Sequence, residues 1–146
     1  MATTKRKTKQ LTIPKLIQKA QKVFNAYIRQ RDSKDGYFTC ISCFKTLPIA
    51  QINAGHYVPV SKSSFLRFHP DNCHAECISD NGFNGFHLVG YRKNLIKKIG
   101  QKKVQWLEDN QNTVHKWTRS ELEEIIEHYS KLLKTEPHGI DNNLPF

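Results

Sequence analysis

Long apolar runs are missing from this chain of 146 residues. No segment approaches the roughly 20 apolar residues that a membrane-spanning helix needs, and no apolar run near the N-terminus is long enough for a signal peptide. We therefore expect a cytosolic protein that does not bind a membrane. Glycine and proline are also scarce, with seven and six residues, which argues against a low-complexity chain and indicates one folded domain with extensions.

Cysteine is sparse as well, and its spacing argues against a disulfide framework. The four cysteines fall in two close pairs, and a cytosolic protein keeps its thiols reduced. The two residues between Cys40 and Cys43 let both thiolates reach one tetrahedral ion from a tight turn. Buried free thiols are an alternative, whereas a redox motif normally begins the helix of a strand–helix unit. The sequence therefore predicts one structural zinc ion, with the ligands Cys40, Cys43, Cys77 and Cys73, or with His74 or Asp80 in place of Cys73.

Acidic residues are nearly missing from two stretches of the chain. Residues 1–34 contain ten Lys or Arg and one acid, and residues 92–103 contain six Lys or Arg and none. Charges that serve solubility alone would be mixed, so this pattern favours a polyanion, most often nucleic acid. An anionic membrane surface is less favoured, because no aromatic anchors flank the basic segments. The residues expected at the DNA backbone are Lys15, Lys19, Lys22, Arg29, Arg31, Arg67, Arg92, Lys93, Lys97, Lys98, Lys102 and Lys103.

Hydrophobic spacing predicts helices on both sides of an irregular middle. Pro14 suits the first turn of an amphipathic helix with a basic outer side. Gly100 is expected to end a second helix, and Ser120 with Glu123 has the spacing of a capping box. The expected helices span 14–31, about 86–99, a short stretch around 104–107, and 118–134.

The middle, residues 37–79, has no helical period and is rich in aromatic and turn residues. A strand is expected at 37–41, and residues 56–60 and 66–69 are expected to form a hairpin across a turn at 61–64. The predicted class is α+β, a small zinc-containing ββα core with an N-terminal basic helix and C-terminal helices. The expected parts are a disordered basic arm at 1–11, the core with its basic helix at 12–100, a helical extension at 101–134 and a flexible tail at 135–146.

Five short motifs, in one order and at compatible spacing over about residues 15–100, resemble a known family. They are Tyr27-Ile28-Arg29-Gln30-Arg31-Asp32, Cys40-Ile41-Ser42-Cys43, Ala54-Gly55-His56-Tyr57, Leu66-Arg67-Phe68, and Tyr91-Arg92-Lys93-Asn94-Leu95-Ile96 with Ile99-Gly100. Together they resemble the NinG/Rap recombination nucleases of lambda-like phages, and through these the HNH, or ββα-metal, nuclease class. The resemblance implies a metal-dependent endonuclease that acts on branched DNA, such as Holliday junctions and D-loops, in the host cytoplasm.

The resemblance also implies roles for three residues. His56 matches the general base on the first strand of a hairpin, Asn72 the asparagine that holds the loop, and Asn81 the metal ligand near the start of the next helix. The chemistry agrees, because phosphodiester hydrolysis needs a base near neutral pH and a hard cation such as Mg²⁺ or Mn²⁺. Ordinary turn or cap positions are the alternative for both asparagines.

Several positions depart from the family pattern. Asn53 stands where an aspartate is usual, so the catalytic cation is expected to contact an amide there instead of a carboxylate. Asp80 ends what is usually a second Cys-x-x-Cys, whereas Cys73 replaces an apolar residue. His87 stands where asparagine is more common.

Two other functions compete with the nuclease. One is a zinc-containing module that binds DNA or RNA without catalysis, and the other is an assembly protein that uses the acidic helix 118–134 as a partner surface. His56 in combination with Asn72 and Asn81 favours the nuclease, because a binding module has no need of this set. Symmetric cleavage of a junction would need two sites and therefore a homodimer.

Overall fold

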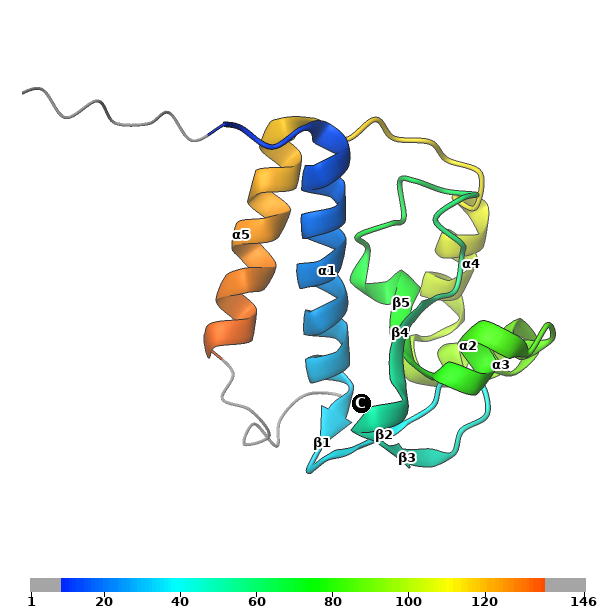
Figure 1. Ribbon diagram of the computed structural model, residues 1–146. Coiled ribbons are helices and arrows are strands. Elements are labelled where there is room, and N and C mark those ends of the chain that lie inside the picture. The colour runs from blue at the N-terminus through cyan, green and yellow to red at the C-terminus, as the bar shows by residue number, and fades with distance from the viewer. Residues whose placement is uncertain (1–8, 136–146) are drawn as a thin grey trace, which may run out of the picture.

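The computed structural model describes residues 9–135, which form five α-helices and two small sheets (Figure 1). The mixed α+β class expected from the sequence is confirmed at this level. Most of the expected arm at 1–11 and nearly all of the tail at 135–146 lie outside the described residues. The elements are α1 (Ile13–Arg31), β1 (Ser33–Lys34), β2 (Tyr37–Thr39), β3 (Thr46–Pro48), η1 (Ile49–Gln51), β4 (Ile52–His56), η2 (Pro70–Asn72), β5 (Cys73–Cys77), α2 (Ile78–Phe83), α3 (His87–Ile99), α4 (Gln101–Asp109) and α5 (Arg119–Thr135).

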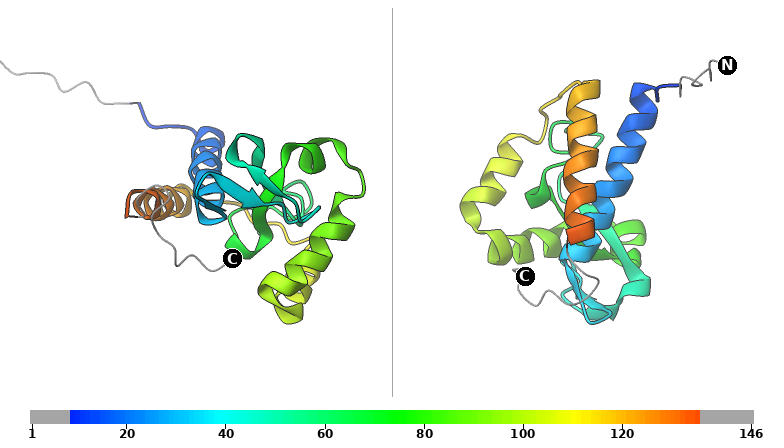
Figure 2. Two further views of the ribbon diagram at one scale, coloured as in Figure 1. Left: turned by 90° about the horizontal axis from the view of Figure 1, so that it is seen from below. Right: turned by 90° about the vertical axis from the view of Figure 1, so that its left-hand side faces the viewer.

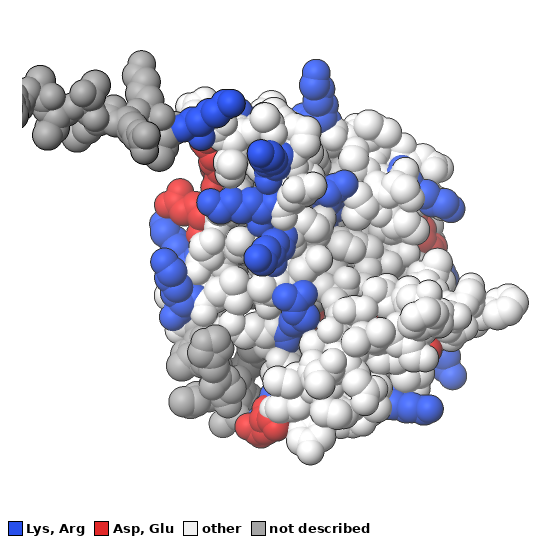
Figure 3. Space-filling model, in the orientation of Figure 1, with Lys and Arg blue, Asp and Glu red and all other residues white. Residues whose placement is uncertain are grey.

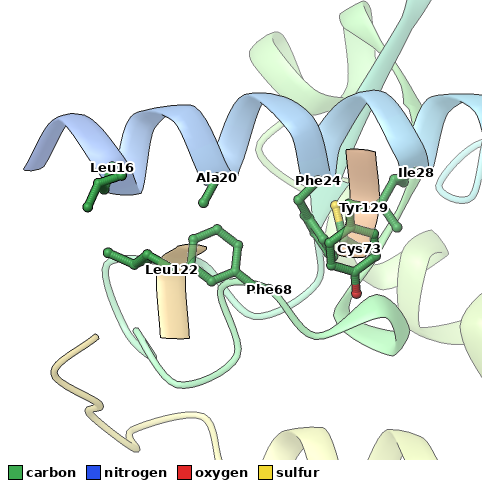
Figure 4. Packing of buried hydrophobic residues seen from close by; sticks show 8 residues of the cluster. All are labelled: Leu16, Ala20, Phe24, Ile28, Phe68, Cys73, Leu122 and Tyr129. Atoms are coloured by element: carbon green, nitrogen blue, oxygen red, sulfur yellow. The ribbon is translucent and has the colours of Figure 1, made fainter. Parts of the chain in front are cut away.

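The first helix, α1, forms as its sequence predicts. Thr12 caps it, since its side chain accepts a hydrogen bond from the backbone N–H of Lys15 at 3.4 Å, and Pro14 fits the first turn. Helix α5 lies beside α1 in both Figure 1 and Figure 2. Their facing side chains join Phe68 and Cys73 in one core (Figure 4): Leu16, Ala20, Phe24, Ile28, Leu122 and Tyr129.

The middle of the chain forms two separate antiparallel sheets. Strands β1, β2 and β3 make one, and the strand expected at 37–41 is confirmed as β2. Strands β4 and β5 make the other, with His56 opposite Cys73 and Ile52 opposite Cys77. The expected hairpin between 56–60 and 66–69 is wrong, because His56 is the last residue of its strand and the chain from 57 to 72 is a loop.

Helices α3 and α4 close a second core over this loop. Tyr91, Leu95, Val104 and Leu107 are buried with Val58 of the loop and with further apolar residues around them. Gly100 ends α3 with φ of 92°, as expected from its freedom to adopt positive φ. None of the helices in residues 9–135 is long and apolar enough to cross a membrane.

The capping box of α5 lies two residues earlier than predicted. The backbone N–H of Glu121 donates to Thr118 Oγ1 at 3.3 Å, and the N–H of Thr118 donates to Glu121 Oε2 at 2.8 Å. Ser120 and Glu123 have the same spacing, so the pattern alone does not determine which pair begins the helix.

Candidate metal centre and nuclease site

Three thiols and one carboxylate meet where β2, β5 and α2 converge. The ligand atoms of Cys40, Cys43, Cys77 and Asp80 all lie within 4.8 Å of one another. Both Cys40 Sγ and Cys77 Sγ contact Asp80 Oδ2, at 3.3 and 3.2 Å. Ligands of a tetrahedral ion with bonds of about 2.3 Å are about 3.8 Å apart, so this group is close enough to hold a metal ion.

Other groups hold the ligands of this centre in place. Asn84 Nδ2 donates to Asp80 Oδ1 at 3.2 Å, which orients the carboxylate as outer-shell partners of metal ligands do. The backbone N–H groups of Cys77 and Asp80 donate to the sulfurs of Cys40 and Cys77, at 3.3 and 3.4 Å. Cys77 is also the N-cap of α2, so the end of the strand and the start of the helix are both fixed at the centre.

Cys73, the fourth ligand preferred from the sequence, lies elsewhere, and the alternative Asp80 takes its place. Cys73 and Cys77 are the two ends of strand β5, and four residues of extended chain span about 13 Å. A turn would have brought the two thiols together, but a strand keeps them apart. Cys73 packs in the core beside α1, where burial raises the pKa of its thiol. His74 is also remote from the centre, since its ring contacts the side chains of Arg31 and Lys98.

Asn72 holds the loop between β4 and β5. It is fully buried, its Oδ1 accepts from the N–H of Val58 at 2.8 Å, and its Nδ2 donates to the carbonyls of Val58 and Leu66 at 3.0 and 3.3 Å. One amide therefore ties both halves of the loop to the start of β5. This is the loop-holding position that the resemblance implied for Asn72.

His56 ends β4 with a defined ring orientation. Its Nε2 lies 3.0 Å from the carbonyl oxygen of Arg67. A carbonyl can only accept, so Nε2 carries the proton and Nδ1 keeps the lone pair. Nδ1 lies 3.9 Å from Cys73 Sγ. Burial lowers the pKa of His56, although the bond to the carbonyl opposes this, so the ring is neutral near pH 7.

The two amides expected at the catalytic cation lie on different elements. Asn53 is in β4, directly opposite Glu76 of β5, whereas Asn81 is exposed on α2. Glu76 was not predicted as a site residue, because a single glutamate within a short strand usually marks a solvent-facing position. It is instead completely buried. Its register opposite Asn53 is the signal that could have found it, and the sequence does not reveal that register.

Two of the expected DNA-binding residues serve inside the protein. Asp32, which is 4% exposed, binds Arg31 at 2.7 Å and Lys98 at 3.1 Å, and it accepts a hydrogen bond from the backbone N–H of Ala75 at 2.9 Å. Arg31 and Lys98 are therefore removed from the exposed basic set. Arg92 is also paired, with Glu108 at 2.6 Å. The sequence suggested surface charges here because the burial of Asp32 depends on how α1, β5 and α3 meet.

Replacing Asp32 by Asn should destabilise the protein by about 3 kcal/mol, because it leaves two buried cations short of a counter-charge. Burial alone would raise the pKa of Asp32, but the hydrogen bond and charge of Arg31, with the charge of Lys98, hold it well below its usual range. This contribution is present above the unfolded pKa of about 4 and is lost as pH falls below it. Urea unfolding at pH 7 and pH 3 measures both effects, and equal losses at the two pH values would contradict this role of the Asp32 charge.

The control for Asp32 is Glu127, which pairs with Lys131 on the exposed face of α5. Glu127→Gln also removes one carboxylate from one ion pair. Because this pair is in solvent, the variant should unfold at nearly the wild-type urea concentration.

A small α+β protein with a Cys₃Asp centre and a histidine at the end of a strand is the class that this fold and site define. The chain belongs to the NinG family, since the family model described as Bacteriophage Lambda NinG protein matches residues 1–138. Protein ninG of Escherichia phage lambda is 42% identical over 118 residues, and protein ninG of Salmonella phage P22 is 39% identical over the same length.

These matches cover 81% of this chain but 55% and 56% of the two relatives. The chain therefore spans about half the length of the curated relatives it matches. No solved structure matches the chain.

Proposed function

We propose that this protein is a metal-dependent endonuclease that hydrolyses phosphodiester bonds in branched DNA, as the HNH class does. The observation that carries the proposal is the hairpin β4–β5 followed directly by α2, with His56 Nδ1 kept as the basic atom. A neutral imidazole fixed in this way suits the deprotonation of water near pH 7. The Asn72 clamp supports the same assignment, because it holds the loop that supplies the Arg67 carbonyl.

In this reaction, His56 Nδ1 takes a proton from water, and the hydroxide formed attacks phosphorus. The P–O bond to the leaving sugar oxygen then breaks, and that oxygen takes up a proton. A divalent cation, Mg²⁺ or Mn²⁺, would supply neutralisation of the phosphate and of the leaving oxygen.

The ion at the Cys₃Asp centre is proposed to be structural zinc. Thiolates favour zinc over the oxygen-seeking Mg²⁺ and Ca²⁺. Cys40, Cys43, Cys77 and Asp80 would fill all four positions of a tetrahedral ion, which leaves none for water or substrate. The centre therefore supports folding and takes no part in the reaction.

The surface charge supports DNA as the partner. Figure 3 shows Lys and Arg side chains gathered over α1, and Lys15, Lys19 and Lys22 are exposed there. A second group, Lys97, Lys102 and Lys103, is exposed on α3 and α4. Contacts of this kind bind the phosphate backbone and carry little sequence preference.

Aromatic exposure between α2 and α3 supports a branched substrate. Phe83 and Phe86 are 85% and 84% exposed, and Val89 beside them is 73% exposed. Unstacked bases offer faces on which aromatic side chains can stack, and a branch point offers such bases where a continuous duplex does not.

Converting Lys97, Lys102 and Lys103 together to Gln should flatten the salt dependence of DNA binding. Each phosphate contact contributes about 0.9 to the slope of log K against log salt, so the slope should fall by as much as about 2.7. Titrations between 50 and 200 mM salt, on the order used for such slopes, measure it. Lys131→Gln, on the acidic helix α5, is the control. A slope unchanged in the triple variant would mean that this group does not face DNA.

Cleavage of matched branched and linear DNA by the purified protein tests the function itself. Cutting of the branched DNA with Mg²⁺ or Mn²⁺, and none with a chelator, is the expected result. Two symmetric cuts in a junction would further require a dimer, and the DNA would be met in the host cytoplasm. Failure to cut either DNA with any divalent metal would overturn the proposal.

The second candidate is a zinc-containing module that binds DNA without cutting it. The observation that favours it is Asn53, an amide where the family usually has aspartate. In that case the protein would bind DNA with the same salt dependence and show no cleavage.

A further inference from the structure

Glu76 is a buried carboxylate with an unused oxygen. It is 0% exposed, and its Oε1 accepts from Ser42 Oγ at 2.6 Å and contacts His87 Nδ1. Its Oε2 has no hydrogen-bond partner within residues 9–135. A buried carboxylate oxygen without a partner is costly unless a proton or a cation satisfies it.

The position of this oxygen explains a glycine next to His56. A Cβ atom on Gly55 would lie 2.1 Å from Glu76 Oε2, so the carboxylate fills the space where residue 55 would carry a side chain. Asn53 is directly opposite Glu76 in the hairpin, and opposite residues on one face have Cβ atoms about 5 Å apart. The carboxylate, the amide and the bare Gly55 therefore share one face of β4–β5.

Helix α3 brings His87 to the same place. His87 is its first residue, with a side chain 20% exposed. The helix lies tightly on the turn that carries Cys40 and Cys43: Asn94 Nδ2 donates to the carbonyl of Ile41 at 2.8 Å, and a Cβ on Gly90 would lie 2.1 Å from the carbonyl oxygen of Ser42. The same packing thus positions both Ser42 and His87 around Glu76.

We propose that Glu76 and His87, with the Asn53 amide, bind the divalent cation that the nuclease uses, in place of Asn81. The role of the cation rests on the proposed function, whereas the site itself does not. The carboxylate expected at residue 53 is here supplied from the opposite strand. Two or three protein groups suffice, because water and substrate phosphates complete the shell of such ions. A nitrogen ligand beside oxygens suits Mn²⁺ better than Mg²⁺.

Binding of Mn²⁺ to the zinc-loaded protein without DNA tests the site. Titration followed by the electron paramagnetic resonance signal of free Mn²⁺ should show one site. Glu76→Gln and His87→Ala should each weaken it at least about tenfold, since loss of even an outer-shell partner costs 10–100-fold. His128→Ala, on the exposed side of α5, is the control and should bind normally. Unchanged affinity in both Glu76→Gln and His87→Ala would overturn the proposal.

Further arms separate this site from the alternatives. Asn81→Ala should keep wild-type Mn²⁺ affinity, and a loss there with none in His87→Ala would restore Asn81 as the ligand. Glu76→Gln alters a buried group, so His87→Ala, at a partly exposed position, gives the result if the first variant does not fold. Mn²⁺ binding through Glu76 and His87 without DNA cleavage would leave the site intact and overturn the nuclease. Cleavage with unchanged Mn²⁺ binding in both variants would do the reverse.

Discussion

The Cys40→Ser variant is expected to lose its zinc and with it the fold of residues 33–85. Cys40 is fully buried, and its sulfur contacts both Asp80 and the backbone N–H of Cys77, so it joins β2, β5 and α2 at one point. Zinc contributes about 10 kcal/mol or more to the folding of small zinc domains, which equals or exceeds the net stability of most proteins, about 5–15 kcal/mol. A serine hydroxyl does not replace a thiolate ligand.

Elemental analysis and thermal melting measure this effect. The wild type should hold one zinc per chain, and Cys40→Ser should hold less than half an equivalent and melt without a cooperative transition. Cys73→Ala is the matched control: it removes a buried thiol outside the centre, so it should keep one zinc and lose on the order of 1 kcal/mol of stability. If Cys73→Ala loses zinc and Asp80→Ala retains it, Cys73 and not Asp80 is the fourth ligand.

The helices were predictable because their signals are local. The apolar stripe of α1, the proline in its first turn and the glycine that ends α3 each act within a few residues, and no distant contact overrides them. The cysteine turn at Cys40 and Cys43 was predictable for the same reason. Its place in the molecule was not, because that depends on strand β5 and helix α2.

The β4–β5 hairpin was mispredicted because its signals are not local. Val58 and Leu66 lie in a loop, and the apolar residues that cover them come from α3 and α4. Their pattern resembles a pair of strands when it is viewed without those helices. The same ambiguity affected Cys73: three intervening residues fit a metal-binding turn, and only the observed strand shows that the two thiols lie far apart.

The buried charges were beyond prediction for a further reason. Asp32, Lys98 and Glu76 are residue types that nearly always face water, and each is buried here by contacts between elements distant in sequence. The glycine of Ala54-Gly55-His56-Tyr57 was visible in the sequence, but the reason for it became clear only with Glu76 packed against its Cα.

His56→Ala is expected to reduce cleavage by about a hundredfold or more, the usual contribution of a positioned general base. Zinc content, DNA affinity and melting temperature should stay close to wild type, because the ring makes one hydrogen bond, to the Arg67 carbonyl, and lies against Phe24 at 6.3 Å between ring centroids. His128→Ala is the control, since this histidine is exposed on α5. Cleavage at the wild-type rate by His56→Ala would place the base elsewhere, with His87, His74 and His69 as the next candidates.

The pH dependence of cleavage gives a second, independent test of the same base. Burial lowers the pKa of His56 from its ordinary value of about 6.5, and imidazolium cannot accept a proton. The cleavage rate should therefore rise with pH through this lowered pKa, and its acidic limb should lie below pH 6.5. Burial and the charge of Lys98 lower the pKa of His74 to about 3, so the unfolded state takes up a proton there as pH falls below 6.5 and stability declines in the same range. Rates must therefore be measured at a temperature where circular dichroism shows the protein folded at every pH. An acidic limb above pH 6.5 in the folded protein would contradict His56 as the base.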